Sequence, residues 1–267
     1  MLTTVVRRGP VDVSVSDTGG DGPTVLLLHG LAGSSRELEA TARGLADTFR
    51  VLLVDQRGHG RSTRRPEDLS RRAFTDDVIA VIERLAPGRP VSLVGQSMGA
   101  HTAFLVAEAR PDLVDRLVML EGHAGAGEGP EVAAAVGAYF ATWPDAFADE
   151  KAALDLLGES PLSTAWVADL ERTPDGLRPR FDADVMRRTL EAVHEPRWAE
   201  WERLLVPTLV VFAEHGMFTP AQQDELLARR PETRRADVPG ASHDAHLDGF
   251  GTWLTILRGF LADDPQA

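Results

Sequence analysis

The chain contains no cysteine, and this absence removes several kinds of chemistry at once. Without a thiol the chain cannot form a disulfide, attack a substrate through a thiolate, or bind a metal through sulfur. Any nucleophile that the chain supplies must therefore be an oxygen or a nitrogen atom.

Positive charge is also scarce. The chain has 28 lysine and arginine residues against 41 aspartate and glutamate residues, which gives a formal net charge of −13 and a pI near 5.0. Lys151 is its one lysine. Proteins bind nucleic acids through concentrated basic patches that neutralise phosphates. We therefore expect no nucleic-acid partner.

Long apolar runs are absent too. A membrane-spanning helix needs about 20 consecutive apolar residues, and no run in the sequence approaches that length. The first residues, Met1–Val15, contain no uninterrupted apolar stretch of the kind that directs secretion. We expect a cytoplasmic protein with no membrane partner, and the sequence predicts no particular oligomeric state.

The remaining composition is that of a globular protein, because 267 residues with 43% hydrophobic and 26% charged content can bury a sizeable core. Short apolar, β-branched runs predict strands at Val11–Val15, Thr24–Leu28, Arg50–Val54, Val91–Val94, Leu117–Leu120, Thr208–Phe212 and Arg234–Val238. Segments with helical spacing lie between most of them or close the chain, at Leu38–Thr48, Phe74–Leu85, Met98–Arg110, Ala221–Arg230 and Gly251–Ala262. The alternation predicts the α/β class, with a mostly parallel central sheet and helices on both faces.

The alternation stops between Glu121 and Val206, where the composition shifts to alanine, tryptophan and charge and no strand is predicted. We interpret residues 122–206 as a helical insertion that caps a core formed by residues 1–121 and 207–267. The glycine-rich stretch at its start, residues 122–130, can serve as a flexible hinge. Its larger aromatic residues either face a pocket or pack against the insertion's own helices. These residues are Tyr139, Phe140, Trp143, Phe147, Trp166, Trp198 and Trp201.

The stretch VGQSMG, residues 94–99, places Ser97 between two glycines where a predicted strand meets a predicted helix. In this setting G-x-S-x-G is a nucleophile elbow. The turn is so tight that side chains at the glycine positions would collide with neighbouring elements, and the serine takes a strained backbone conformation. The strain holds the Ser97 hydroxyl out into a pocket, and the N-terminus of the following helix offers free N–H groups to an oxyanion.

Two further motifs accompany the elbow. HGLAGS (residues 29–34) and DQRGHGRS (residues 55–62) each follow directly after a predicted strand. Together the three motifs resemble those of the α/β-hydrolase superfamily, in its serine-nucleophile, esterase- and lactonase-like branch with a helical lid. The resemblance covers the chain from about Val11 to Ala262 apart from the insertion. It implies an oxyanion hole made by the backbone N–H groups of Leu31 and Met98, and it implies structural roles for His29, Asp55 and His59.

A serine hydroxyl needs an adjacent base, which histidine supplies because it exchanges a proton near neutral pH. The stretch PGASHDAHLD, residues 239–248, resembles the superfamily's P-G-x-x-H-x-x-H-L-D ending, whose first histidine is the base. The resemblance makes His243 the base and His246 a structural neighbour. We expect His101, inside the helix after the elbow, to be a surface or wall residue. The other histidines that remain as alternatives are His123, His194 and His215.

The base in turn needs a carboxylate that orients it and stabilises the imidazolium. Most members of the superfamily carry an aspartate after the penultimate strand, but Gly216 stands at that position here. Some branches carry the acid one strand earlier, where this chain has Glu121. An unpaired carboxylate at the end of a buried strand would be costly, so we predict the triad Ser97–His243–Glu121. Glu214 is the alternative acid, because a small loop shift could bring it to His243.

This constellation predicts a serine hydrolase that cleaves a carboxylic ester, lactone or thioester of a small apolar substrate through an acyl-enzyme. Carbon–carbon bond hydrolases and cofactor-free haloperoxidases use the same triad, so both activities stay open. A non-catalytic ligand-binding protein of the same fold also stays open, because the usual acid position holds a glycine. No metal or nucleotide motif is visible in the sequence, and we expect no cofactor and no metal.

Overall fold

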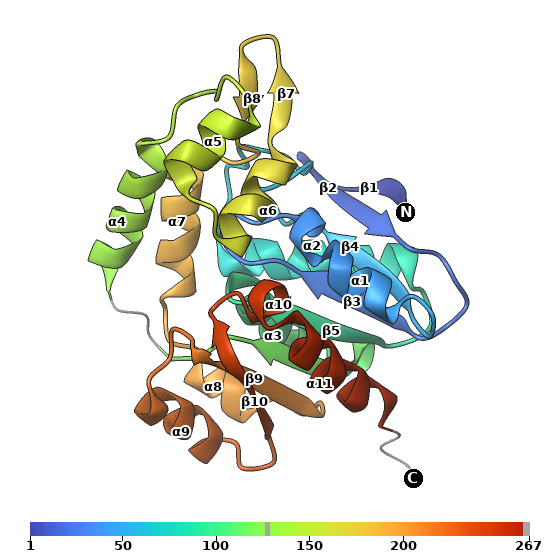
Figure 1. Ribbon diagram of the computed structural model, residues 1–267. Coiled ribbons are helices and arrows are strands. Elements are labelled where there is room, and N and C mark those ends of the chain that lie inside the picture. The colour runs from blue at the N-terminus through green and yellow to red at the C-terminus, as the bar shows by residue number, and fades with distance from the viewer. Residues whose placement is uncertain (126–128, 264–267) are drawn as a thin grey trace.

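The computed structural model describes residues 1–125 and 129–263. Within those residues, eight strands form one sheet in the order β1-β2-β4-β3-β5-β6-β9-β10. The strands are β1 (Leu2–Arg8), β2 (Val11–Asp17), β3 (Thr24–Leu28), β4 (Arg50–Val54), β5 (Val91–Gln96), β6 (Val114–Leu120), β9 (Thr208–His215) and β10 (Arg234–Ser242). The sheet runs through the middle and lower parts of the molecule in Figure 1.

The sheet is mostly parallel, which confirms the prediction. Strands β3, β4, β5, β6, β9 and β10 pair in parallel, whereas β2 is antiparallel to both of its neighbours, β1 and β4. The sequence patterns do not predict β1. It is an edge strand of which only Val6 is buried, so it lacks the apolar run that identifies the central strands.

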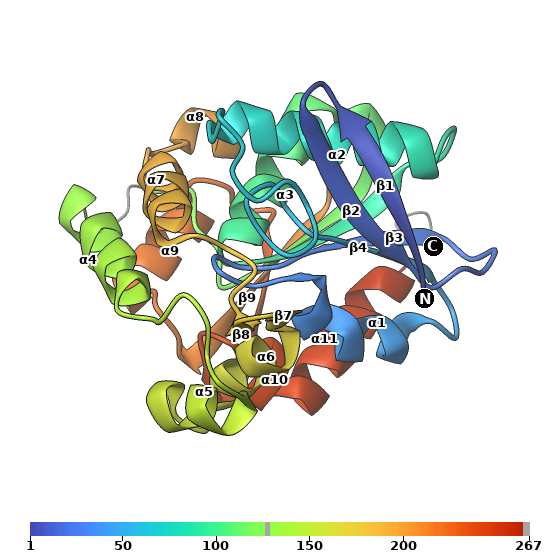
Figure 2. The same ribbon diagram turned by 90° about the horizontal axis from the view of Figure 1, so that it is seen from above.

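Helices cover both faces of the sheet (Figure 2). On one face lie α2 (Arg71–Leu85) and α3 (Met98–Ala109), and on the other lie α1 (Glu39–Leu45) and α11 (Phe250–Ala262). Neighbouring residues of a strand point to opposite faces, so Leu26 of β3 packs on the α2–α3 side and Leu27 on the α1–α11 side. The shorter helical elements are η1 (Ser35–Leu38), η2 (Pro111–Leu113), α9 (Pro220–Ala228) and α10 (Ala245–Asp248).

The part of the chain between β6 and β9, called the inserted segment below, is largely helical, and α4 to α7 form the upper part of Figure 1. Its described elements are α4 (Pro130–Ala141), α5 (Glu150–Leu157), α6 (Pro161–Asp169), β7 (Glu171–Thr173), β8 (Gly176–Arg178), α7 (Ala183–Val193) and α8 (Trp198–Glu202). The β7–β8 hairpin shows that the prediction of no strand in this region was wrong. Each of these strands has only three residues, too few to display a two-residue period. Residues 126–128 of the glycine-rich stretch predicted to be a hinge lie outside the described residues.

The aromatic residues of the inserted segment pack largely on one another. Phe140, Trp143, Trp166 and Phe181 form a cluster in which the contacting ring centroids are 4.9 to 5.9 Å apart. Trp201 is instead buried against α3. Of the two roles that the sequence left open, packing therefore describes Phe140, Trp143, Trp166 and Trp201.

Candidate active site

Ser97 lies between β5 and α3, where its backbone has φ +52° and ψ −117°. A positive φ is strained for any residue other than glycine. Both neighbouring glycines are required by close approach: a Cβ at Gly95 would collide with the backbone of Gly99, and a Cβ at Gly99 would lie 2.6 Å from the His29 carbonyl oxygen. The tight, strained turn predicted from the sequence is therefore present.

Two backbone N–H groups near Ser97 are free to bind an anion. Met98 is the first residue of α3, where a helix leaves its N–H groups without internal partners. Leu31 lies in the loop after β3. In the part of the chain that the structure describes, neither N–H donates a hydrogen bond to a backbone oxygen, and both residues line the same cavity as Ser97. Together with the positive end of the α3 dipole, these groups can stabilise a negatively charged oxygen.

His243 lies in the loop between β10 and α10, and its Nδ1 is 3.1 Å from Oε2 of Glu121. The Glu121 side chain is 0% exposed, whereas that of His243 is 23% exposed. The carboxylate also accepts the N–H of Ala213 on Oε1 and the N–H of Met217 on Oε2, both at 2.8 Å. Three hydrogen bonds therefore compensate for the burial of this charge. With Nδ1–H donating to Glu121, Nε2 is the basic nitrogen of the ring.

The elbow is tied to the loop that carries the histidine. Gln96, the residue before the serine, is buried and donates from Nε2 to the carbonyl oxygen of His243 at 3.2 Å. Ser97 and His243 line one cavity. Among the described residues, no hydrogen bond joins Ser97 Oγ to the imidazole. Contacts of this kind often tighten only in a substrate complex.

The alternative acid, Glu214, is placed elsewhere. Its side chain is exposed and accepts the N–H of Gly240 at 2.8 Å. The glycine at the usual acid position also has a structural explanation. A Cβ at Gly216 would lie 2.5 Å from Cδ of Glu121. The Glu121 carboxylate thus occupies the space that a side chain at position 216 would need.

The two loops expected to be structural do brace the site. His29 Nε2 accepts the N–H of Gln56 at 3.0 Å, and the Asp55 carboxylate accepts the N–H of Arg61 at 2.9 Å. Burial, and then the neighbouring His29, lowers the pKa of His59 to about 3, so this ring stays neutral. None of these side chains lines the cavity that contains Ser97.

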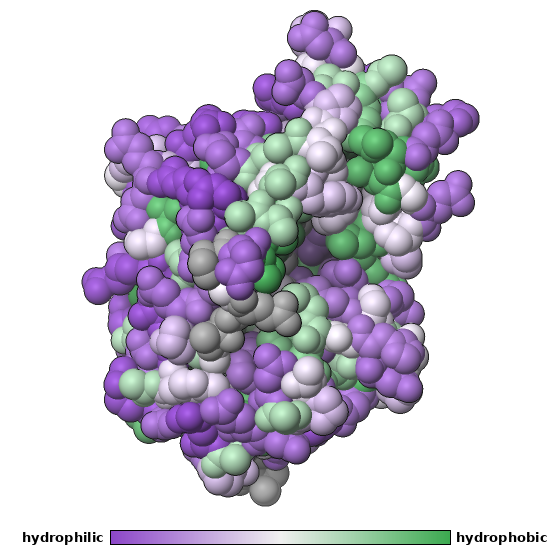
Figure 3. Space-filling view, turned by 90° about the vertical axis from the view of Figure 1, so that its left-hand side faces the viewer, coloured by the Kyte–Doolittle hydropathy of each residue, from purple (hydrophilic) through white to green (hydrophobic). Residues whose placement is uncertain are grey.

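A cavity of about 210 Å³ lies between the core and the inserted segment, and the surface in Figure 3 is hollowed between these two parts. Most of its lining surface is apolar, although seven of the sixteen lining residues have polar or charged side chains. The lining residues are Leu31, Ser97, Met98, His101, Glu121, Gly122, His123, Gly125, Val132, Leu190, Val193, His194, Met217, Phe218, Gln222 and His243. No sequence motif marks Met217 and Phe218, on the β9–α9 connection, or Gln222, in the first turn of α9, and none of the three was predicted.

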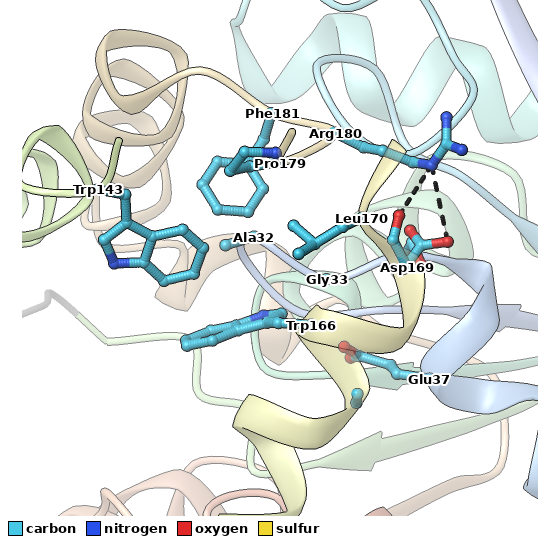
Figure 4. Close-up of a pocket in the computed structure, with 12 residues that line it drawn as sticks. Ala32, Gly33, Glu37, Trp143, Trp166, Asp169, Leu170, Pro179, Arg180 and Phe181 are labelled. Atoms are coloured by element: carbon cyan, nitrogen blue, oxygen red, sulfur yellow. Dashed lines mark hydrogen bonds and ion pairs between the residues drawn. The ribbon is translucent and has the colours of Figure 1, made fainter. Parts of the chain in front are cut away.

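A second and much smaller cavity, of about 20 Å³, lies beside Trp143, Trp166 and Phe181 (Figure 4). That volume is enough for about one water molecule, so it cannot hold a substrate. Its polar side carries Asp169 and Arg180, whose Nε donates to the Asp169 carbonyl oxygen at 2.9 Å. This cavity belongs to the contact between the inserted segment and the loop after β3.

Over residues 1–125 and 129–263, no helix is long and apolar enough to cross a bilayer. The same residues contain no group of three or more histidine, aspartate or glutamate side chains placed to hold a metal ion.

A strained serine at a strand-to-helix junction, on a mostly parallel sheet with helices on both faces, defines the α/β-hydrolase class. The family described as "alpha/beta hydrolase fold" matches residues 23–250, and the chain belongs to this family.

The chain is 28% identical over 270 residues to "sn-1-specific diacylglycerol lipase ABHD11" from Mus musculus. This alignment covers 96% of this chain and 87% of that protein. It is 29% identical over 255 residues to "2-(acetamidomethylene)succinate hydrolase" from Mesorhizobium japonicum, covering 89% and 87% of the two chains. The solved structure of E-2-(acetamidomethylene)succinate hydrolase matches with a TM-score of 0.87 at 26% identity, over 98% of this chain and 99% of that one. These relatives are named as hydrolases, and membership of the family supports hydrolase activity for this chain.

Proposed function

We propose that this protein is a serine hydrolase that cleaves a carboxylic ester, lactone or thioester of a small apolar substrate through an acyl-enzyme. The observation that carries the proposal is the 3.1 Å contact between His243 Nδ1 and Glu121 Oε2, beside a serine held at a strained elbow. The catalytic triad is Ser97, His243 and Glu121, with the chain order serine, acid, histidine.

In the first half of the reaction, His243 Nε2 takes the proton of Ser97 Oγ, which attacks the substrate carbonyl carbon. Glu121 keeps the proton on Nδ1 and stabilises the imidazolium that forms. The N–H groups of Leu31 and Met98 bind the oxyanion of the tetrahedral intermediate. His243 then gives its proton to the leaving group, and an ester of Ser97 remains.

The second half of the reaction repeats these steps with water. His243 Nε2 takes a proton from a water molecule, which attacks the acyl carbon through the same oxyanion hole. The proton returns to Ser97 Oγ as the acid product leaves. The net reaction consumes one water molecule and needs no cofactor.

The lining of the cavity supports a small, partly apolar substrate. We assign the inserted segment, residues 122–206, as the lid over a core of residues 1–121 and 207–267, because Val132, Leu190 and Val193 line the cavity from that segment. The mouse relative is named for diacylglycerol, whose acyl groups are esters, and this supports an ester as the bond that is cleaved.

The test is labelling of Ser97. The purified protein is incubated with a fluorophosphonate probe and its intact mass is measured, with Ser97→Ala as the control. In parallel, short-chain esters, thioesters and lactones are screened for hydrolysis. We expect one adduct per chain in the wild type, none in Ser97→Ala, and a loss of turnover of about 10⁴-fold or more in the variant. A folded wild type with neither adduct nor turnover would contradict the proposal and favour a ligand-binding protein.

A further inference from the structure

Four histidines line the cavity that contains Ser97: His101, His123, His194 and His243. Two of them have partners within the protein. His243 pairs with the Glu121 carboxylate, and His123 uses both ring nitrogens on backbone groups at 2.9 Å. The other two imidazoles are therefore the ones that the proposed mechanism and the packing leave unexplained.

His101 is the clearer case. It is 3% exposed, yet neither of its ring nitrogens has a hydrogen-bond partner among the described residues. Its ring packs edge-on against Phe104, with the centroids 5.3 Å apart. A buried polar group without a partner costs free energy, and such groups are rare in folded proteins. Because His101 lines the cavity, a ligand in the cavity can supply the missing partner.

His194 lies in the inserted segment, directly after α7, and lines the same cavity. Its Nδ1 is also buried without a hydrogen-bond partner in the described residues. One unpaired imidazole thus comes from the core helix α3 and the other from the inserted segment.

The charges near these imidazoles are positive. Arg71 is 2% exposed, and its Nε and Nη1 have no partner in the part of the chain that the structure describes. Its Nη2 donates to Thr102 Oγ1, on the residue next to His101, and its guanidinium carbon lies 4.4 Å from the centroid of the Phe74 ring. Among the described residues no carboxylate forms an ion pair with Arg71. The Arg71 charge is therefore buried next to α3 without an opposite charge.

Burial lowers the pKa values of His101 and Arg71, and the neighbouring positive charges lower them further. Burial, and then Arg71, Arg197 and His194, lower the pKa of His101 well below its ordinary value. Burial and then Arg197 lower the pKa of Arg71 to about 9, so Arg71 still carries its charge at neutral pH. An anion placed at this end of the cavity would reduce the repulsion between these groups.

We propose that the end of the cavity formed by His101 and His194 binds a carboxylate of the substrate, so that the enzyme prefers monoesters or monothioesters of short dicarboxylic acids. This inference rests on the proposed hydrolase activity and names a substrate class for it. His101 donates one ring N–H to the carboxylate. Arg71 of α2, which donates to Thr102 beside His101, adds positive potential. Leu190 and Val193, which line the cavity, cover the methylene groups.

The spacing of the two sites sets the length of the substrate. His101 follows Ser97 by four residues, slightly more than one helical turn, which is about 6 Å along the helix axis. A succinyl or glutaryl group can therefore extend from a carbonyl carbon at Ser97 Oγ to a carboxylate at His101. Hydrolysis of such a monoester consumes one water molecule and releases the dicarboxylate, an alcohol and one proton.

The experiment compares three esters of similar length: monoethyl glutarate, ethyl pentanoate and diethyl glutarate. Acid release is followed in a pH-stat at neutral pH, and kcat/KM is measured for each ester. A hydrogen bond to a charged group is strong enough to favour monoethyl glutarate by about tenfold or more over both neutral esters. In His101→Leu this ratio of kcat/KM values should fall to about one.

Two further variants keep the result interpretable. His194→Leu removes the second imidazole, which lies at a partly exposed position, and we expect it to lower the same ratio of kcat/KM values. It provides the test if His101→Leu does not fold. His215→Leu is the matched control, because His215 is exposed and does not line the cavity. It should keep the wild-type ratio.

A binding measurement separates this inference from the proposed function. Calorimetry on Ser97→Ala, with glutarate and pentanoate as ligands, should show tighter binding of glutarate, and Ser97→Ala/His101→Leu should lose that preference. Equal kcat/KM values for all three esters, with turnover that depends on Ser97, would overturn the carboxylate site and leave the hydrolase proposal intact. If no ester is turned over and no fluorophosphonate adduct forms, the hydrolase proposal fails. The calorimetric comparison then tests the carboxylate site by itself. Equal affinities for glutarate and pentanoate would overturn that site.

Discussion

Strands β6 and β9 lie side by side in the sheet, with Leu120 paired in parallel to Val211, yet they end differently. β6 is followed by Glu121, whose side chain is fully buried against His243. β9 continues to His215 and is followed by Gly216, where most members of the superfamily carry the acid. The difference is that the carboxylate beside His243 comes from the end of β6, whereas the end of β9 offers no side chain at the usual acid position.

The two strand ends are complementary. Glu121 has a left-handed backbone, with φ +49°, and its carboxylate lies across the end of β9, where it accepts the N–H groups of Ala213 and Met217. Gly216 has no side chain in the space that this carboxylate fills. Glutamate at one position and glycine at the other therefore form a matched pair, and changing one without the other should damage the site.

Glu121→Gln has the largest expected effect. The amide keeps the shape of the carboxylate but loses its charge, and its NH₂ group can stabilise the wrong tautomer of His243. A similar change of acid to amide in a serine-protease triad costs about 10⁴ in kcat. We expect kcat on a short-chain ester to fall by about 10³- to 10⁴-fold, measured on protein whose circular dichroism is unchanged.

Glu214→Gln is the matched control at the end of β9. Its side chain is exposed, and among the described residues it hydrogen-bonds only to the N–H of Gly240. We therefore expect kcat to stay within about twofold of the wild type. The assignment of the acid would be wrong if kcat fell by orders of magnitude in Glu214→Gln and stayed near the wild-type value in Glu121→Gln. The acid would then come from the β9 end.

Gly216→Ala tests the space beside Glu121. The new Cβ would lie 2.5 Å from Cδ of Glu121, so the carboxylate must move. We expect kcat to fall by about 10- to 100-fold, and Tm to fall by about 3–10 °C because the site is overpacked. Gly259→Ala is the control, since a Cβ at that position in α11 meets nothing within 4 Å. Activity of Gly216→Ala equal to that of Gly259→Ala would show that the two strand ends are independent.

A double variant moves the acid from one strand end to the other. In Glu121→Gly/Gly216→Asp, the side chain at the end of β6 is removed from the space beside His243 Nδ1. The new aspartate at the end of β9 takes that space. Glycine also suits the left-handed backbone at position 121. We expect the double variant to recover kcat by about tenfold over Glu121→Gly alone, whereas Gly216→Asp alone should be as poor as Gly216→Ala or poorer. No recovery would mean that the β9 end cannot orient the histidine in this chain.

The parts of the site that depend on neighbours in sequence could be predicted. Gly95, Ser97 and Gly99 lie within one turn, so their spacing alone specifies the tight backbone that the structure has. The placement of Glu121 was predicted because Gly216 left the usual acid position empty. What the sequence could not supply was the reason for that glycine, which depends on the register between β6 and β9.

The parts that depend on distant segments could not be predicted. Met217 and Phe218 line the cavity from the β9–α9 connection, together with residues of α3 and α7 that lie far away in the chain. The large aromatics of the inserted segment looked equally suited to a pocket, yet they pack on one another. Composition alone does not tell a pocket wall from a packed interior, because both are apolar.

Asp169, at the end of α6, is a second buried carboxylate, and comparing it with Glu121 shows how burial and hydrogen bonding each affect the stability of a buried charge. Like Glu121 it is buried, at 9% exposure, but its Oδ1 has no hydrogen-bond partner among the described residues. The guanidinium nitrogens of Arg61 and Arg180 lie 3.6 and 3.8 Å from that oxygen. Burial raises the pKa of Asp169, against the opposing effects of Ser34 and the two arginines.

Asp169→Asn should therefore have a smaller effect than the substitutions of Glu121 and Gly216, and it should raise Tm rather than lower it. A carboxyl whose folded-state pKa is raised contributes stability below its unfolded pKa and loses it as the pH rises through the folded-state pKa. Because asparagine resembles the protonated form, Tm should rise by about 1–3 °C over the wild type at pH 7, and the difference should shrink as the pH falls toward about 4. Asp175→Asn, on the exposed β7–β8 turn, should show no such dependence. A lower Tm for Asp169→Asn at pH 7 would mean that its arginines stabilise this carboxylate as fully as the three donors stabilise Glu121.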